Sequence, residues 1–337
     1  MKPLVSVLTP CYNGEKFIDR YFQAILAQTY TKLELIFVND GSTDDTERVA
    51  LCYRQQLEEK GIIFKYVYKE NGGQASAMNV GFPYVTGEYL IWPDADDYLS
   101  PDSVEKRVDF LESHSDVHWV RSDAVAIDEV TGEKLYRFAK EGDKQTKDIF
   151  LDLILEETYC CCGCYMLRMQ ALREIYPELH IFEGAQGQNW QIQLPMAARY
   201  PCGYVHEGLY YYMIRAGSHS HNQTDLEDWL VRYNGLEEIL YKMVELSGRT
   251  DRDYKKIIDE KAVRTRFRLY VTYNEKEKAK EYYQKLLDMG ICTVDHTRRY
   301  LKKYHPVHYF FFKIGCIFKR AFAKLTRGVG KREKHND

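Results

Sequence analysis

The feature that most constrains the fold is an apolar run that ends in acidic residues. Residues 89–92 read Tyr-Leu-Ile-Trp, and after one proline the chain carries Asp94, Asp96 and Asp97. A continuous apolar run of this kind is typical of a strand that is buried on both faces of a sheet. Because carboxylates are costly to bury without a neutralising cation, the stretch predicts a strand that delivers its acids to the edge of a sheet.

A divalent metal is the obvious neutralising cation for these acids. Asp94 and Asp96 are two residues apart and can present oxygens to one side, and Mg²⁺ and Mn²⁺ prefer oxygen ligands. A metal held by one or two carboxylates takes its other ligands from water and from substrate phosphates. The alternative is that the acids cap a helix that begins near Pro101, as Asp-rich turns often do.

Chain length, net charge and the lengths of the apolar segments limit the class of protein to which this sequence can belong. The chain of 337 residues is long enough for one large α/β domain and a smaller appendage. Its formal net charge is −3, so no global field favours nucleic acid as a partner. The first apolar segment is too short for a signal peptide, and no run reaches the length of a membrane span. We therefore expect a cytoplasmic protein that does not bind nucleic acid.

The cysteines are also typical of a cytoplasmic protein. Four of the nine crowd into residues 160–164. Neighbouring cysteines in a strand point to opposite faces, and no second cysteine pair or suitably spaced histidine accompanies them. We expect small buried hydrophobic residues in a reducing environment rather than a metal site.

Strand and helix patterns alternate over the first hundred residues. Apolar runs at 4–9, 33–38 and 62–68 each lead into a polar, turn-rich segment, and helical spacing follows the first two runs. This order predicts right-handed crossovers and a mostly parallel sheet. Ligands of such sheets bind at the carboxyl ends of the strands.

The rest of the chain divides into a mixed region and a helical region. After residue 226 only helical periodicity remains, which predicts an appendage without catalytic residues. Before it we expect strands at 117–123, 161–168, 202–206 and 209–215, a hairpin formed by 124–127 and 134–138, and helices at 148–155 and 170–176.

Five motifs, in order, resemble those of family 2 glycosyltransferases. They are residues 5–13 (VSVLTPCYN), 28–30 (QTY), 39–44 (NDGSTD), 71–73 with 77–81 (NGG and AMNVG), and 87–90 with 94–97 (GEYL and DADD). The resemblance implies a GT-A fold, with a Rossmann-like nucleotide-sugar half at about 1–100 and an acceptor half at about 101–222. It also implies transfer of a sugar, with inversion, from a nucleotide diphosphate sugar to a hydroxyl of a glycan or glycolipid, with UDP as the expected nucleotide.

The same resemblance assigns roles on the donor side. Thr9, Pro10 and Tyr12 match the loop that packs on the nucleoside, where an aromatic face can stack on a base. Asp96 matches the ligand of Mn²⁺ or Mg²⁺, which neutralises the departing diphosphate. The nucleotide-sugar-binding residues implied are Thr9, Pro10, Tyr12, Asp40, Gln74, Asn79, Asp94, Ala95, Arg215 and His219.

The catalytic base is where the chain departs from the family pattern. Many members use an Asp in a Glu-Asp pair, whereas this chain has Gln188 and Asn189, whose amides cannot accept a proton. Glu183 is the nearest carboxylate and our first candidate, with an exposed loop acid as the alternative; Asp123 is a weaker candidate. Gln188, Asn189 and Trp190 are expected to shape the acceptor pocket, although Trp190 could instead pack in the core.

A loop at 215–221 is expected to close over the diphosphate. Arg215, Ser218, His219 and His221 are suitable hydrogen-bond donors there. His219 is also a candidate second metal ligand beside Asp96.

Three regions, the last of them a tail, follow from these patterns. We expect a GT-A domain at 1–222, a helical appendage at 223–303 and a basic aromatic tail at 304–337. The tail mixes Phe310, Phe311 and Phe312 with lysine and arginine, which suits docking on anionic lipid at the inner face of the membrane. Packing on the main domain or an oligomer contact are the alternatives.

Two other functions compete with the transferase. A non-catalytic module that binds glycans or nucleotide sugars would explain the missing Glu-Asp pair. A nucleotidyltransferase would normally show a glycine- and lysine-rich phosphate loop near its first strand, and residues 10–13 do not supply one.

Overall fold

A computed structural model describes residues 2–139, 147–184, 187–215, 224–314 and 316. The chain divides into two compact units. The first consists of Met1–Asn222 and Asn234–Lys255, and the second of Gln223–Tyr233 and Lys256–Asp337. None of the helices in the described ranges has the length and apolar content needed to cross a membrane.

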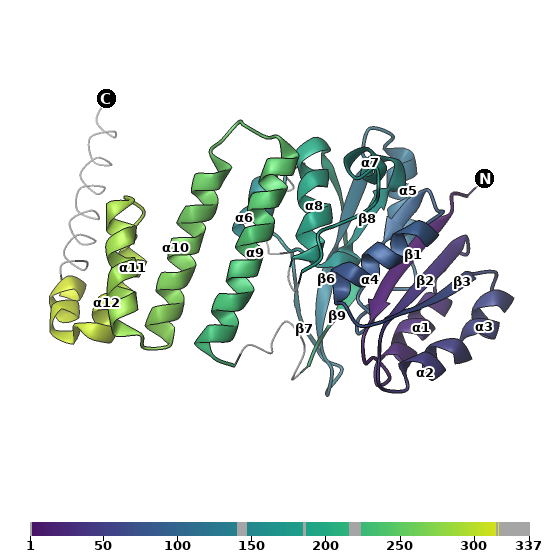
Figure 1. Cartoon of the computed structure of the whole chain (residues 1–337), viewed down its shortest axis with the longest axis horizontal. Helices are drawn as coiled ribbons and strands as arrows, with labels where there is room; N and C mark the ends of the chain where they lie inside the picture. The colour runs from purple at the N-terminus through teal and green to yellow at the C-terminus, as the bar shows by residue number, and fades with distance from the viewer. Residues whose placement is uncertain (1, 140–146, 185–186, 216–223, 315, 317–337) are drawn as a thin grey trace, which may run out of the picture. The chain divides into compact units, whose positions relative to one another are not determined.

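The first unit is built on a sheet of nine strands, counted over the described residues (Figure 1). The strands are β1 (Val5–Cys11), β2 (Leu33–Asp40), β3 (Ile63–Lys69), β4 (Tyr89–Ile91), β5 (Tyr98–Leu99), β6 (Trp119–Asp128), β7 (Lys134–Arg137), β8 (Tyr165–Arg168) and β9 (Cys202–Ile214). Their order in the sheet is β3-β2-β1-β4-β8-β6-β9-β5, with β7 paired to β6.

Helices flank this sheet on both faces. The helices of this unit are α1 (Ile18–Leu26), α2 (Thr46–Cys52), α3 (Arg54–Glu59), α4 (Gln74–Gly81), α5 (Ser103–Ser113), α6 (Phe150–Leu155), α7 (Met169–Ile175), α8 (Gln188–Arg199) and the C-terminal part of α9 (Leu226–Ser247). Two short 3-10 helices, η1 (Phe82–Tyr84) and η2 (Cys162–Cys164), complete the unit.

The N-terminal half of the sheet is parallel, as its alternating strands and helices predict. β1 pairs in parallel with both β2 and β4, and β2 pairs in parallel with β3. Every residue of β1, β2 and β4 is buried, in keeping with their apolar runs. Beyond β4 the sheet is mixed, because β8 runs antiparallel to both of its neighbours while β6 and β9 run parallel.

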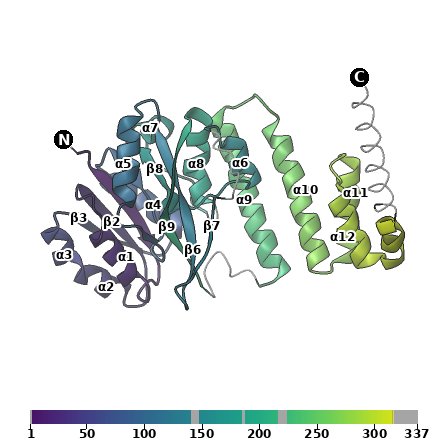
Figure 2. The same ribbon diagram turned by 180° about the vertical axis from the view of Figure 1, so that it is seen from behind.

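Opposite faces of β1 and β2 are covered by α1 and α4. Tyr21 of α1 lies with its hydroxyl 2.6 Å from the Thr9 hydroxyl and packs on the Phe37 ring. A Cβ at Gly81 of α4 would lie 2.3 Å from a methyl carbon of Leu8. Because Leu8 and Thr9 are successive strand residues, the two helices lie on opposite faces (Figures 1 and 2). Only glycine allows α4 to approach this closely.

Several predicted strands differ from the structure. The strand predicted at 161–168 begins only at Tyr165, because residues 162–164 form η2. A Cβ at Gly163 would lie 2.0 Å from the Tyr210 ring, so a tight turn of small residues is packed against β9 there. The strands predicted at 202–206 and 209–215 are one strand, β9, whose pairing with β6 shifts register next to Gly208.

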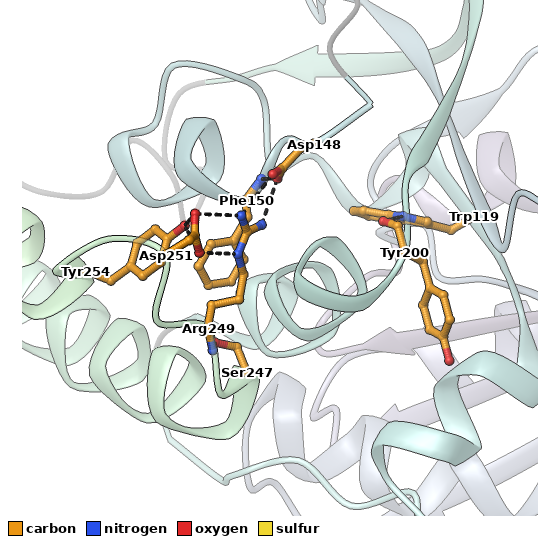
Figure 3. Close-up of polar contacts among 8 residues, drawn as sticks. All are labelled: Trp119, Asp148, Phe150, Tyr200, Ser247, Arg249, Asp251 and Tyr254. Carbon is orange, nitrogen blue, oxygen red and sulfur yellow. Dashed lines mark hydrogen bonds and ion pairs between the residues drawn. The ribbon is translucent and has the colours of Figure 1, made fainter.

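An arginine joins the end of α9 to α6 within the first unit. Arg249 donates to both carboxylate oxygens of Asp148, at 2.9 and 3.0 Å, and also to Asp251 (Figure 3). Its guanidinium carbon lies 5.0 Å from the centroid of the Phe150 ring. A bidentate ion pair of this kind is more specific than a single contact.

The second unit has its own small core. It contains most of α10 (Tyr254–Thr272), α11 (Lys276–Asp288) and α12 (Val294–Tyr304). The buried residues of its core cluster are Phe267, Tyr270, Ala279, Leu286 and Tyr300. Thr293 caps α12 by accepting a hydrogen bond from the backbone N–H of His296, whose ring in turn accepts one from the Thr293 N–H.

Candidate functional site

The carboxyl ends of β1, β2 and β4 lie side by side and carry the predicted donor residues. At the end of β1 the Thr9 hydroxyl donates to the Pro93 carbonyl, at 3.1 Å, which ties β1 to the loop after β4. Thr9 and Pro10 are both buried. Tyr12 is half exposed, so it is the residue of this loop that presents a ring to solvent. The predicted stacking surface is therefore available at Tyr12.

Asp40, at the end of β2, organises the loop that starts α4. Its carboxylate accepts hydrogen bonds from the backbone N–H groups of Gly72 and Gly73, at 3.1 and 2.8 Å, and from Lys69 Nζ at 2.7 Å. Gly41 has a φ of +70°, and a Cβ there would lie 2.5 Å from the backbone nitrogen of Asn71. Asp40 thus lies at the predicted edge, but both of its oxygens already have partners within the loop.

The three acids after β4 have different environments. Asp97 is buried and accepts hydrogen bonds from the Tyr210 hydroxyl, at 2.7 Å, and from the backbone N–H of Met213, at 2.8 Å. Burial, together with the charges of Asp96 and Asp94, raises the pKa of Asp97 well above its ordinary value. Asp97 therefore anchors the acidic loop to β9 and is shielded from a ligand.

Asp94 links the donor edge to helix α8. Its carboxylate accepts hydrogen bonds from Gln74 Nε2, at 2.7 Å, and from the Cys162 thiol, at 3.0 Å. The Gln74 carbonyl oxygen in turn accepts a hydrogen bond from Gln188, at the start of α8. Burial raises the pKa of Asp94 to about 6, and the charge of Asp96 adds to the effect.

Asp96 is paired with Arg215 across the site. Arg215 Nη2 lies 2.7 Å from Asp96 Oδ2, and its guanidinium carbon lies 4.3 Å from the centroid of the Phe17 ring. The Asp96 carbonyl accepts a hydrogen bond from Arg20 at 2.7 Å. Within the described part of the chain, Asp96 Oδ1 has no hydrogen-bond partner, and Arg215 Nε is buried without one. Among the described residues, therefore, one Asp96 oxygen and one buried Arg215 N–H have their hydrogen-bonding capacity unused.

The acidic side chains of this site suit a metal ion that takes its remaining ligands from the substrate. Among the residues that the structure describes, no three His, Cys, Asp or Glu side chains are grouped to hold an ion. Asp96 offers a free oxygen beside Asp94, which matches a cation bound through one or two carboxylates and substrate phosphates. His219, the predicted second ligand, lies outside the described residues, as do Ser218 and His221. Ala95, between the two acids, is buried.

Glu183, the candidate base, is held by Asn79. Glu183 is exposed, and its Oε1 accepts a hydrogen bond from Asn79 Nδ2 at 3.3 Å. The Asn79 side chain also exchanges two hydrogen bonds of 2.9 Å with the backbone of Ile181. Asn79, which we predicted to bind the nucleotide sugar, therefore fixes the segment that carries Glu183. This role has no signature in the sequence, because Asn79 and Glu183 are far apart along the chain.

The other acceptor-side residues lie at the start of α8. Asn189 accepts a hydrogen bond from Trp92 Nε1, at 3.2 Å. Trp190 is half buried and donates to the Leu153 carbonyl of α6, at 3.3 Å, so at least one side of it packs against that helix.

The weaker candidate base has no access to an acceptor. Asp123 is fully buried; it pairs with Arg137 Nε at 2.5 Å and accepts hydrogen bonds from the backbone N–H groups of Ala124 and Ala139. These contacts close the end of the β6–β7 hairpin. The carboxylate therefore has a structural role.

Sequence reasoning missed Cys162 as a partner of Asp94. Cys162 and Cys164 are buried, as predicted, whereas Cys160 and Cys161 are partly exposed. A buried thiol that donates to a carboxylate cannot be told from an apolar cysteine by spacing alone, since 68 residues separate Cys162 from Asp94.

Replacing Asp94 by asparagine is expected to stabilise the ligand-free protein. The folded-state pKa of Asp94, about 6, lies above the ordinary value of about 3.9, so ionisation of Asp94 costs folding free energy. That cost is absent below the ordinary value and complete once the pH rises above about 6. The free energy of unfolding of Asp94→Asn should therefore exceed that of the wild type by about 3 kcal/mol at pH 8 and should nearly match it at pH 4. Urea denaturation at both pH values checks this, and a variant that is less stable at pH 8 would contradict it.

Sequence comparisons assign the chain to a family. A family model described as "Glycosyl transferase family 2" matches residues 6–176, just over half of the chain. The minor teichoic acid biosynthesis protein GgaB of Bacillus subtilis is 28% identical over 225 residues, which is 65% of this chain and 24% of that protein. The chain spans only 17–32% of the length of the rickettsial uncharacterized glycosyltransferases that it matches at 41–44% identity.

Solved structures share the fold. TarS 1-349 from S. aureus, in complex with UDP-GlcNAc, superposes with a TM-score of 0.56 at 17% identity, covering 89% of this chain and 79% of that one. The mannosyltransferase PcManGT from Pyrobaculum calidifontis, in complex with GDP-Man and Mn²⁺, gives a TM-score of 0.53 at 16% identity, covering 96% and 88%. The predicted GT-A fold is confirmed, and the chain belongs to glycosyl transferase family 2.

Proposed function

We propose that this protein transfers a sugar, with inversion, from a nucleotide diphosphate sugar to a hydroxyl of a glycan or glycolipid. The observation that carries the proposal is the meeting of Asp94 and Asp96 at the carboxyl end of β4, next to β1, with an Asp96 oxygen that has no hydrogen-bond partner among the described residues. Ligands of parallel sheets bind at this edge. UDP is the nucleotide we propose, supported by the UDP-GlcNAc complex of TarS.

On the donor side, the roles divide between Asp96 and Arg215. Asp96 would hold Mn²⁺ or Mg²⁺, a choice supported by the Mn²⁺ complex of PcManGT. The metal would supply Lewis acidity to the departing diphosphate. Arg215, with Nε free of hydrogen bonds to the described residues, can donate to the diphosphate, and Tyr12 can stack on the base. We also propose His219 as a second ligand of the metal.

On the acceptor side, Glu183 is the proposed base. It takes the proton from the acceptor hydroxyl while the acceptor oxygen bonds to the sugar carbon. The bond from that carbon to the phosphate oxygen breaks, and its electron pair leaves with the nucleoside diphosphate. Asn79 orients Glu183, and Gln188, Asn189 and Trp190 would line the acceptor pocket. The teichoic acid role in the name of GgaB supports a glycan-like polymer as acceptor.

The proposed organisation keeps the predicted regions. Residues 1–222 would form the transferase domain, 223–303 a helical appendage and 304–337 a tail. We place the protein in the cytoplasm, where the predicted reducing environment suits nine cysteines without a disulfide among the described ones.

Donor hydrolysis tests the proposal. With UDP-linked sugars and Mn²⁺, the protein should release UDP, and Asp96→Ala should abolish the release while it remains folded. A panel that adds GDP-linked mannose would identify the nucleotide through thermal stabilisation with and without metal. No turnover with any donor, despite stabilisation by one of them, would favour the non-catalytic binding module.

A further inference from the structure

An exposed apolar face lies on the helix at 306–314, which follows α12. Val307, Phe310 and Phe311 are 68%, 61% and 66% exposed, and Ile314 is partly buried. Their positions i, i+3, i+4 and i+7 place all four on one side of the helix. The rings of Phe310 and Phe311 contact each other, with centroids 5.7 Å apart. We call these four residues the apolar helix face.

This face groups several exposed apolar side chains on one side of a helix. Single exposed hydrophobic residues are common on protein surfaces, whereas a contiguous group on one side of a helix indicates an interaction surface. The apolar helix face holds three large, mostly exposed side chains within one and a half turns. A partner with an apolar region is needed to shield these side chains from water.

The surrounding charge indicates which partner. Residues 302–337 contain ten Lys and Arg but only Glu333 and Asp337 as acids, so this segment has a net charge of +8. Since the whole chain has −3, the remaining 301 residues have −11. Lys302 and Lys303, in the last turn of α12, and Lys313, in the helix that carries the apolar helix face, are exposed. A strongly basic segment on an acidic protein would attract an anionic surface that the rest of the chain repels.

We propose that the apolar helix face docks on an anionic lipid bilayer. The two phenylalanine rings enter the boundary between headgroups and acyl chains, and the lysines lie at the level of the lipid phosphates. A bilayer supplies both the apolar interior and the negative charge. A second copy of the chain would bring another basic segment of +8, whose repulsion opposes a contact through this face.

Vesicle cosedimentation of the full-length protein tests this surface. The protein should bind vesicles of phosphatidylcholine that contain about 30 mol% phosphatidylglycerol, and binding should weaken with salt and with vesicles of phosphatidylcholine alone. Phe310→Ser combined with Phe311→Ser should lower the partition coefficient by about tenfold or more, because two aromatic rings are lost from the boundary. The matched control is Val130→Ser combined with Leu135→Ser, two exposed apolar residues of the β6–β7 hairpin, which should bind normally.

A second pair of variants isolates the charge. Lys302→Gln combined with Lys303→Gln should weaken binding several-fold, whereas Lys276→Gln combined with Lys280→Gln, exposed in α11, should not. Equal binding to neutral and anionic vesicles, or no binding to either, would overturn the proposal. So would a wild-type dimer that Phe310→Ser and Phe311→Ser dissociate without any vesicle binding. Donor hydrolysis in solution should be unchanged in all these variants, which separates this proposal from the transferase itself.

Discussion

Replacing Asp96 by asparagine is expected to lower kcat/KM for sugar transfer by about a thousandfold. Asp96 has a carboxylate oxygen without a hydrogen-bond partner among the described residues, and it is the only proposed metal ligand that the structure describes. Asparagine keeps the shape of the side chain but removes the charge that holds the cation, and stabilisation of the leaving diphosphate by a metal amounts to several kcal/mol. Steady-state kinetics with UDP-sugar and Mn²⁺ measure the loss.

Two controls keep the Asp96 result interpretable. Asp116→Asn removes an exposed carboxylate from a loop that precedes β6 and should leave kcat/KM unchanged. Because the charge of Asp96 contributes to the raised pKa of Asp94, Asp96→Asn should also lower that pKa, which shows that the variant is folded with Asp94 in place. An activity within a few-fold of the wild type would remove Asp96 from the reaction.

The second large loss of transferase activity is expected for Glu183→Gln. Loss of a general base typically costs 10²–10⁴-fold in rate, so kcat should fall by about a thousandfold while the KM for the donor stays constant. Glu178→Gln, an exposed acid five residues away, is the matched control.

A substitution at Asn79 tests the role of Glu183 as the base through a smaller expected effect. Asn79→Ala removes the hydrogen bond to Glu183 and the two to Ile181, so kcat should fall by less than in Glu183→Gln. Unchanged transfer in Glu183→Gln would mean that another group, or the substrate itself, accepts the proton.

The donor edge could be predicted because short-range patterns determine it. The apolar runs of β1, β2 and β4 are buried on both faces, and parallel strands bring their carboxyl ends together, so Asp40 and Asp94 were placed correctly at one edge. The distinct roles of the acids could not be predicted. Asp97 differs from Asp96 only in which side of the loop it faces, and that depends on Tyr210 of β9, more than a hundred residues later.

The acceptor side was less predictable for the same physical reason. The environment of Trp190 is set by α6, and the anchoring of Glu183 is set by Asn79 of α4; both contacts join distant parts of the chain. The start of β8 was misplaced because an apolar run does not distinguish a strand from a short 3-10 helix. The close approach of Gly163 to Tyr210, which favours the turn, is visible only in three dimensions.

A structure of the protein with a UDP-sugar and Mn²⁺ tests the central claim most directly. We expect a cation at about 2.1 Å from an Asp96 oxygen, bridging to the diphosphate, with Arg215 released from Asp96 toward the phosphates. A nucleotide bound elsewhere, or bound at this edge with the Asp96–Arg215 pair intact and no cation, would contradict it.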